Sequence, residues 1–300
     1  ARRGVVVSVY SGCCDVRLDD RELLCDLVAD LARTQKTTVA VGDEVLVHDV
    51  GSARWLVTTV LPRRTLLSRP DPHDPAIERV IAANIDIVCI VVSLVAPPLH
   101  PRLIDRMLVG VQRGGAEPLI VVNKVDLADE DELEVAAELL LPYADIDVPI
   151  VFVSAEQRAG LDELRDHLRG RICAFVGHSG VGKSSLVNAI YPIAAARTGE
   201  VRERDGRGRH TTSASRLYRF DDGTQVADTP GIRSFGLWLP TAEELRSYFP
   251  EFDELAVRCR FSDCTHTHEP DCAVREAVEA GEVSEYRYET WVRILEDEDA

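Results

Sequence analysis

A short stretch in the second half of the chain has the composition and spacing of a phosphate-binding loop. It runs from Gly177 to Ser184 and reads G-H-S-G-V-G-K-S. In such a loop, glycines let successive backbone N–H groups surround a β-phosphate, Lys183 neutralises the β and γ oxygens, and Ser184 offers its hydroxyl to Mg²⁺. A glycine-rich turn can also be an ordinary tight loop, so companion motifs must decide. The candidate phosphate-binding residues are Gly177, His178, Ser179, Gly180, Val181, Gly182, Lys183, Ser184 and Ser185.

Two further motifs have the chemistry to select the base of a nucleotide. They are N-K-V-D, which begins at Asn123, and S-A, which begins at Ser154. The Asp126 carboxylate can accept hydrogen bonds from guanine N1–H and the 2-amino group, whereas adenine would leave it unpaired, and such sites reject the wrong base strongly. Alone, each motif can also be an Asn/Asp turn or a serine helix cap. With the phosphate loop they predict a guanine-nucleotide site that includes Asn123, Lys124, Asp126, Ser154 and Ala155.

The same site needs ligands for magnesium. A D-T-P-G motif begins at Asp228, which can hold Mg²⁺ through a water molecule, and the Gly231 N–H can sense a γ-phosphate. Between this motif and the phosphate loop lies the sequence G-R-H-T-T, in which either Thr211 or Thr212 can complete the Mg²⁺ shell. The sequence therefore predicts a magnesium region made by Ser184, Asp228 and one of these threonines.

Cysteines and histidines near the C-terminal end have the spacing of metal ligands. The pattern Cys259-x₄-Cys264-x-His266-x₅-Cys272 offers three thiolates and an imidazole, a closed set typical of structural Zn²⁺ rather than catalytic Zn²⁺. His268 is an alternative fourth ligand, and three buried free thiols are the alternative without a metal. The flanking helices offer little apolar core, so zinc is expected to supply much of the folding free energy of this region.

The elements that must position these motifs have two different periodicities. Residues 4–66 are typical of short β segments in a small barrel, and the proline-rich stretch 69–75 is expected to be a linker. Beyond it, continuous Ile/Val-rich runs alternate with helical patterns, which indicates an α/β domain with a parallel sheet buried on both faces. The runs cover 85–95, 118–123, 149–154 and 171–177, and the helical patterns include 130–141 and 160–168.

The order of the motifs differs from that of an ordinary G domain. N-K-V-D and S-A precede the phosphate loop and D-T-P-G, whereas the usual order is the reverse. The domain is therefore predicted to be circularly permuted, with the former termini joined near residues 169–171. D-T-P-G then leads directly into the C-terminal region, and we hypothesise that hydrolysis moves that region.

Charge is distributed unevenly along the chain. Lys and Arg number 34 and Asp and Glu 51, for a net charge of −17, which argues against a uniform nucleic-acid-binding surface. Most of the excess lies in residues 236–300, whereas the segment 197–219 contains seven arginines and is locally basic. Phosphate contact is expected there. No apolar stretch reaches the roughly 18 residues of a membrane span.

These features together resemble the circularly permuted, small ribosomal subunit-dependent GTPases called RsgA or YjeQ. The resemblance covers nearly the whole chain and rests on the permuted order and on G-H-S-G-V-G-K-S-S, G-R-H-T-T and D-T-P-G-I-R-S-F-G-L-W. It implies a multidomain protein. The domains would be an N-terminal OB-fold β-barrel over residues 1–67, a central α/β P-loop GTPase over 68–235 and a mainly helical zinc-binding domain over 236–300.

The resemblance also implies a GTPase that is slow alone and stimulated by the small ribosomal subunit in its late maturation. Ile232 stands where many GTPases have a water-orienting Gln, so the attacking water must be positioned otherwise. The resemblance implies His210 for this role; a histidine that faces solvent or RNA is the alternative. The candidate catalytic residues are His210, Lys183, Thr211 and Thr212.

We therefore expect an enzyme that hydrolyses GTP to GDP and phosphate, with Mg²⁺ and one structural Zn²⁺. The alternative is a GTP-regulated rRNA-binding assembly scaffold in which hydrolysis is incidental. The expected partners are the small ribosomal subunit and its rRNA, not DNA or a membrane, and the protein is expected to be a cytoplasmic monomer.

Overall fold

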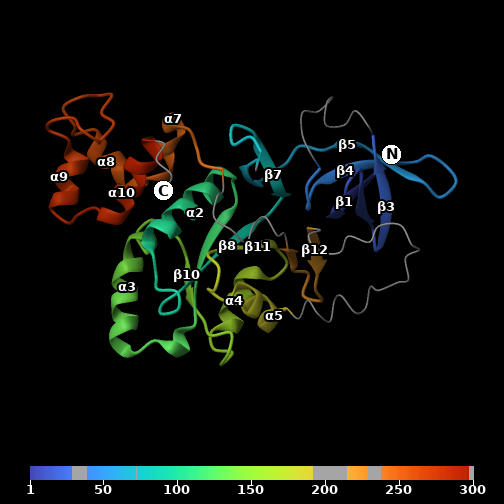
Figure 1. The fold of residues 1–300 in the computed structure, drawn as a ribbon, viewed down its shortest axis with the longest axis horizontal. Helices are drawn as coiled ribbons and strands as arrows, with labels where there is room; N and C mark the ends of the chain where they lie inside the picture. The colour runs from blue at the N-terminus through green and yellow to red at the C-terminus, as the bar shows by residue number, and fades with distance from the viewer. Residues whose placement is uncertain (29–38, 72, 192–214, 229–237, 297–300) are drawn as a thin grey trace.

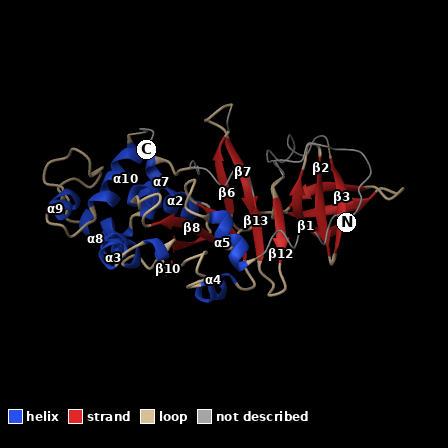
Figure 2. Cartoon of the chain, turned by 60° about the horizontal axis from the view of Figure 1, so that its bottom comes forward, coloured by secondary structure: helices blue, strands red, loops and turns tan. Residues whose placement is uncertain are grey.

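Eleven strands of the computed structural model form one continuous sheet in the order β10-β9-β8-β11-β13-β12-β1-β2-β3-β5-β4. The structure describes residues 1–28, 39–71, 73–191, 215–228 and 238–296. One end of the sheet curls into a barrel, the other is layered with helices, and the helical C-terminal region lies at the end away from the barrel (Figures 1 and 2). Within the described ranges, no helix is long and apolar enough to cross a membrane.

The N-terminal strands close into a barrel. β1 pairs with both β2 and β4, and β3 pairs with β5, so the pairing runs β1-β2-β3-β5-β4 and returns to β1. Alternate side chains such as Val6, Val16 and Val57 fill the interior. This five-stranded closure is that of an OB-fold and confirms the predicted barrel. The strands are β1 (Arg2–Val9), β2 (Cys13–Leu18), β3 (Arg21–Leu27), β4 (Glu44–Asp49) and β5 (Trp55–Val60).

The central part is a sheet buried on both faces, parallel from β10 to β13, with β12 as an antiparallel neighbour of β13. In β8, Val88 and Ile90 pack in a core with α2 and α3, whereas Ile87 and Cys89 pack in a second core with α4 and α5. Burial on both faces explains the continuous apolar runs and confirms the predicted α/β layers. The elements are β8 (Ile87–Ser93), α2 (Pro101–Arg113), β9 (Glu117–Asn123), η1 (Val125–Leu127), α3 (Glu130–Ala144), β10 (Ile150–Phe152), α4 (Leu161–Leu168), β11 (Ile172–Val176), α5 (Lys183–Ile190), β12 (Arg216–Arg219) and β13 (Gln225–Asp228).

The spatial order of the strands is that of a permuted chain. β11 lies between β8 and β13 in the sheet, although β8, β9 and β10 all precede it in the sequence. A tight turn joins α4 to β11: the Arg171 N–H donates to the Leu168 carbonyl at 3.0 Å, and Gly170 has a φ of 71°. The predicted connection at residues 169–171 is therefore present.

The stretch expected to be a linker belongs to a β-hairpin. β6 (Leu66–Pro70) and β7 (Glu78–Ala83) pair antiparallel as a separate two-stranded sheet. The buried Asp71 carboxylate organises the loop, accepting hydrogen bonds from the backbone N–H groups of His73 at 2.7 Å and Asp74 at 3.2 Å. The linker interpretation is wrong because Pro70 is the last residue of β6 and Pro75 lies in the hairpin loop, positions that a β-hairpin tolerates.

Short helices around an aromatic core form the C-terminal region. The rings of Phe249 and Phe252 stack with centroids 5.3 Å apart, and both meet Trp291 edge-on. Val109 of α2 joins this core, so the region packs against α2. The expectation of little apolar core is therefore wrong. The elements are α7 (Ala242–Leu245), η3 (Arg246–Tyr248), η4 (Pro250–Phe252), α8 (Asp253–Ala256), α9 (Ala273–Glu279) and α10 (Glu285–Leu295).

A buried ion pair connects this region to α2. The Arg287 side chain is 1% exposed and donates to Asp105 Oδ1 at 3.2 Å and to Glu251 Oε1 at 2.6 Å. Its guanidinium lies 4.4 Å from the ring centroid of Phe249, and Thr290 Oγ1 donates to Asp105 Oδ2 at 3.1 Å. Burial raises the pKa of Asp105, and the neighbouring Arg287 charge opposes that shift. Loss of Arg287 would therefore raise the pKa of Asp105 further.

Candidate nucleotide site and metal centre

The phosphate loop follows the carboxyl end of β11 and leads into α5, as the motif predicts. Two of its glycines are required by close contacts as well as by backbone conformation. At Gly177, φ is 146° and a Cβ would lie 2.2 Å from the Val91 carbonyl oxygen. At Gly182, φ is 88° and a Cβ would lie 2.4 Å from Asn123 Nδ2. The second contact brings the loop directly against the N-K-V-D motif.

Asn123 is the residue that holds three motifs together. It ends β9 and is almost fully buried. Its Nδ2 donates to the Val181 carbonyl of the phosphate loop at 2.9 Å, and its Oδ1 accepts from the Ala155 N–H of the S-A motif at 3.2 Å. Ser154 is also buried, and its Oγ accepts from the Gln157 N–H at 2.9 Å. Ser154 thus also caps a turn, which is the structural alternative to base selection for that motif.

Lys124 and Asp126 occupy the turn that follows. Lys124 has a φ of 64°, and its Nζ donates to the Gly180 carbonyl at 2.6 Å and to the Ala96 carbonyl. Its ammonium group thus bridges the phosphate loop and the loop after β8. Asp126 lies in η1, half-buried, and its carboxylate makes no hydrogen bond or ion pair with another residue in the described ranges. An unpaired carboxylate at this edge can accept hydrogen bonds from a ligand.

The ionic groups of the phosphate site surround the same loop. Lys183 Nζ donates to the Gly177 carbonyl at 2.7 Å and the His178 carbonyl at 2.6 Å, so the ammonium lies across the loop. Ser184 is exposed in the first turn of α5. Asp228 ends β13, which runs parallel to β11, so its carboxylate lies at the same sheet edge as the loop. Lysine, hydroxyl and carboxylate form a set that suits a phosphate and a divalent cation.

Several predicted site residues lie outside the described residues. They are His210, Thr211, Thr212, Gly231 and Ile232.

One part of the site, the loop at 94–100, was not predicted from the sequence motifs. It supplies the Ala96 carbonyl to Lys124, and with the phosphate loop it encloses a cavity of about 100 Å³ lined by residues including Pro97, His100 and His178. The Pro97-Pro98 pair directly after a strand was the available signal, because it marks a loop.

The metal-ligand pattern folds into a compact cluster. Cys259, Cys264, His266 and Cys272 bring their ligand atoms within 4.8 Å of one another. His266 Nδ1 lies 3.6 Å from Cys259 Sγ and 3.4 Å from Cys272 Sγ, and those two sulfurs are 3.9 Å apart. Tetrahedral zinc with its usual bond lengths requires S···S of about 3.8 Å and S···N of about 3.5 Å. The donor set and its distances therefore fit Zn²⁺.

Surrounding residues fix the cluster and separate the two histidines. His266 has a φ of 63°, its carbonyl accepts from Tyr288 Oη at 2.8 Å, and burial lowers the pKa of its imidazole. His268 is exposed, and its Nδ1 lies 2.9 Å from Thr267 Oγ1. The structure thus brings His266 to the thiols and leaves His268 outside the cluster. Glu269 accepts hydrogen bonds from the Thr265, Thr267 and His268 N–H groups and so orders the loop.

Comparison with known proteins places the whole chain among permuted GTPases. Residues 60–238 match the model of the RsgA GTPase family. The chain is 41% identical over 99% of its length to "Small ribosomal subunit biogenesis GTPase RsgA 1" of Vibrio vulnificus, covering 84% of that protein, and 40% identical to the RsgA protein of Thermotoga neapolitana, covering 96% of it.

Solved structures agree with this placement along the full chain. The crystal structure of YjeQ from Thermotoga maritima superposes with a TM-score of 0.77 at 36% identity, covering 99% of this chain and 98% of that one. The structure of YloQ, described as a circularly permuted GTPase, gives 0.73 at 30% identity and covers 99% and 94%. With the permuted strand order and the three motifs joined at Asn123, these matches show that the chain belongs to the RsgA family of circularly permuted GTPases.

Proposed function

We propose that this protein hydrolyses GTP to GDP and phosphate, with Mg²⁺, in the late maturation of the small ribosomal subunit. Its relatives are named small ribosomal subunit biogenesis GTPases, and it spans most of their length. The observation that carries the proposal is the Asn123 junction, which joins the phosphate loop to both base-selecting motifs. The rRNA-binding scaffold with incidental hydrolysis is not favoured, because the family is one of GTPases.

Guanine recognition is assigned to Asp126 and the loops around it. Its half-buried carboxylate is available to accept from guanine N1–H and the 2-amino group, and adenine would leave it unpaired. Asn123 and Lys124 fix the backbone of the surrounding loops, and Ser154 and Ala155 complete the wall of the base site.

Phosphate binding is assigned to residues 177–185, with Lys183 neutralising the β and γ oxygens. Ser184, Asp228 and Thr211 or Thr212 would hold Mg²⁺, which neutralises negative charge on the phosphates. The Gly231 N–H would sense the γ-phosphate.

Positioning of the attacking water is assigned to His210, because Ile232 has no polar side-chain atom. The alternative remains a solvent-facing or RNA-facing histidine.

The remaining assignments concern metal and partners. Zn²⁺ in the cluster of Cys259, Cys264, His266 and Cys272 would hold the loop around it, and with every ligand position filled it would not act in catalysis.

We propose domain limits at 67/68 and 235/236. We also propose contact with the small subunit through its rRNA, a monomeric state and a cytoplasmic location. DNA is not proposed as a partner.

Nucleotide specificity and subunit dependence test the proposal together. GTP hydrolysis should exceed ATP hydrolysis and rise on adding purified small subunits. Asp126→Asn should lower GTP affinity at least about a hundredfold and restore binding of xanthosine triphosphate, whose 2-oxo group accepts from the new amide. Asp147→Asn, at an exposed aspartate outside the motifs, is the matched control. Equal turnover of ATP and GTP, or no response to the subunit, would refute the proposal.

A further inference from the structure

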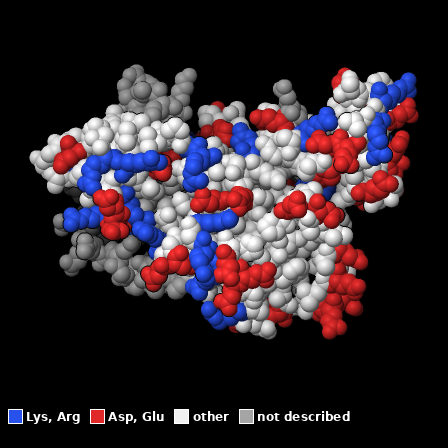
Figure 3. All heavy atoms as spheres, turned by 180° about the vertical axis from the view of Figure 1, so that it is seen from behind, with Lys and Arg blue, Asp and Glu red and all other residues white. Residues whose placement is uncertain are grey.

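Helix α3 and the residues that flank it carry the densest run of negative charge in the described part of the chain. Residues 126–147 contain nine acidic residues, at 126, 129, 130, 131, 132, 134, 138, 145 and 147, and no Lys or Arg. In the rear view, the acidic spheres gather over α3 at the lower right (Figure 3). By itself such a run is a solvated helix face.

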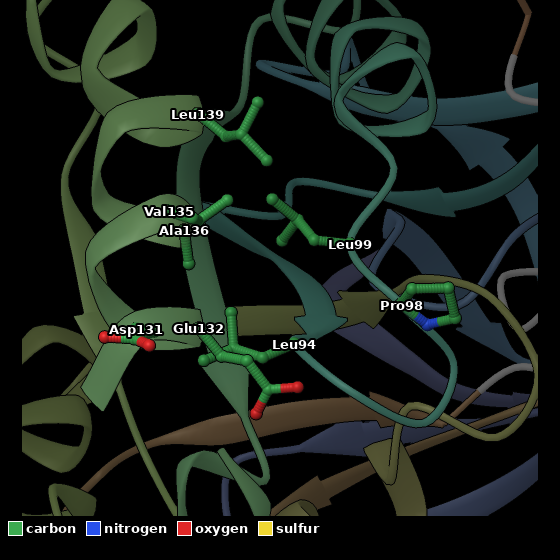
Figure 4. A pocket seen from close by; sticks show the side chains of 8 residues that line it. All are labelled: Leu94, Pro98, Leu99, Asp131, Glu132, Val135, Ala136 and Leu139. Atoms are coloured by element: carbon green, nitrogen blue, oxygen red, sulfur yellow. The ribbon is translucent and has the colours of Figure 1, made fainter. Parts of the chain in front are cut away.

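An apolar groove adjoins this acidic face, so the surface combines negative charge with exposed apolar side chains. The cavity has a volume of about 330 Å³ and lies between α3 and the loop after β8. In Figure 4, Val135 and Leu99 point toward each other across it, and Asp131 and Glu132 lie at one end. Its apolar walls are Leu94, Pro98, Leu99, Val135, Ala136 and Leu139.

Backbone contacts hold the loop that forms one wall of the groove. Leu94 is 8% exposed, Val95 pairs with Pro98 as a β-bridge, and the Leu99 N–H donates to the Leu94 carbonyl at 3.3 Å. On the opposite wall, Val135 is 55% exposed although it is aliphatic and lies in the middle of a helix. A preformed groove with an exposed aliphatic wall suits a ligand that brings apolar side chains.

Charge decides between the possible occupants. A phosphate backbone would be repelled by nine carboxylates, and a second copy of this chain would bring the same face and a net charge of −17. A positively charged segment would be attracted, and apolar groups on it would fill the groove. We propose that this groove docks a lysine- and arginine-rich polypeptide segment whose aliphatic side chains insert between Val135 and Leu99. The groove shares the loop at 94–100 with the nucleotide site, but Asp131, Val135 and Glu138 are not among the nucleotide residues. Docking of a polypeptide here goes beyond GTP hydrolysis.

The test uses the full chain and a fluorescein-labelled amphipathic peptide of leucine and lysine, with fluorescence anisotropy as the readout. Asp131→Lys with Glu138→Lys should weaken binding at least about tenfold, because both carboxylates flank Val135 on one helix face. Val135→Ser should weaken binding about fivefold with the charge unchanged. Glu279→Lys with Glu282→Lys makes the same charge change in the C-terminal region and should leave affinity unaltered.

Three further measurements can overturn the proposal. Equal binding of a lysine and serine peptide of the same charge would show attraction without a groove. Binding of a single-stranded RNA oligonucleotide that Val135→Ser weakens would assign this face to RNA. Sedimentation showing a dimer that the α3 charge-reversal variant dissociates would assign it to a second copy. Melting curves for each variant exclude loss of folding as the cause of weaker binding.

Discussion

The barrel joins the central domain edge to edge, whereas the C-terminal region packs onto the side of α2. β1 pairs with β12 at Ser8 and Arg216, and the ion pairs beside this strand pair are partly exposed, while Val7 and Val41 of the barrel lie buried in the central apolar core. Glu22 accepts from Arg216 at 3.0 Å and from Arg17 at 3.1 Å, and Arg17 also donates to Gln225 at 2.9 Å.

The C-terminal contact instead buries an aromatic core and Arg287. Both contacts bury apolar side chains, but they differ in their ion pairs. Separating the partly exposed pairs beside the barrel should cost little, whereas separating the buried Arg287 from Asp105 should cost several kcal/mol, about 3–5.

Removal of the metal should have the largest effect. It should separate the metal-dependent loop of the C-terminal region from the part that packs against α2. Cys264→Ser should abolish binding of one equivalent of Zn²⁺, and the loop at 257–272 should lose hydrogen-exchange protection, because metal binding supplies its folding free energy. Helix α10 should keep its protection, because Phe249, Phe252 and Trp291 pack without the metal. Cys173→Ser, at a buried cysteine outside the cluster, is the control for zinc content. Loss of protection throughout α10 would support the expectation that zinc supplies much of the folding free energy of this region.

Removal of the buried cation should have the next largest effect. Arg287→Ala leaves Asp105 unpaired in the interior and should destabilise the C-terminal region by about 3–5 kcal/mol, measured by native-state hydrogen exchange. Arg102→Ala removes a pair with Glu289 in the same interface, but Arg102 is 43% exposed, so its cost should stay below about 1 kcal/mol. Equal costs for the two variants would contradict the contrast between buried and exposed contacts.

The pH dependence of the Arg287→Ala variant gives a further check. Burial already raises the folded-state pKa of Asp105 beside Arg287, and removing the cation should raise it further above the unfolded value. The folded variant then binds the proton more tightly than the unfolded chain, so its stability should fall as pH rises through that range. The cost relative to wild type should therefore be larger at neutral pH than in mild acid.

The zinc cluster and the Asp105–Arg287 pair show which features can be predicted from the sequence. The zinc ligands and the phosphate loop lie close together in the chain, so spacing alone identifies them. Asp105 and Arg287 are 182 residues apart, and each is a charged residue on a helix, which is typical of a solvated position. The buried Asp105 also interrupts the apolar pattern of α2, which the sequence analysis did not predict. Likewise β3, R-E-L-L-C-D-L, lacks a clean alternation because Leu24, an apolar residue, is 52% exposed. Sites made by residues close together in the chain can be predicted from the sequence, whereas contacts between distant segments cannot.

A smaller effect is expected at the barrel interface. Arg216→Ala should cost about 1 kcal/mol or less in unfolding free energy, because Arg216 and Glu22 are both about one-fifth exposed. The cost should shrink in 1 M salt, where the Debye length falls from about 10 Å to about 3 Å. Arg219→Ala, whose pair with Asp20 is 3.7 Å long and exposed, should have no measurable effect. A cost near that of Arg287→Ala would remove the distinction between the two attachments.

The smallest expected effect is no change, in the response of the C-terminal region to the nucleotide. The motif order suggested that hydrolysis moves this region, since D-T-P-G leads into it. Releasing it from α2 would separate Arg287 from Asp105, at about 3–5 kcal/mol, whereas coupling between sites is typically about 1–3 kcal/mol. Protease protection of residues 238–296 should therefore be the same with GDP and with a non-hydrolysable GTP analogue. Any change should fall in the barrel, because β1 pairs with β12, the neighbour of the strand that ends at Asp228. Altered cleavage within 238–296 alone would show that the hypothesis from motif order was correct and that the buried pair does not hold the region in place.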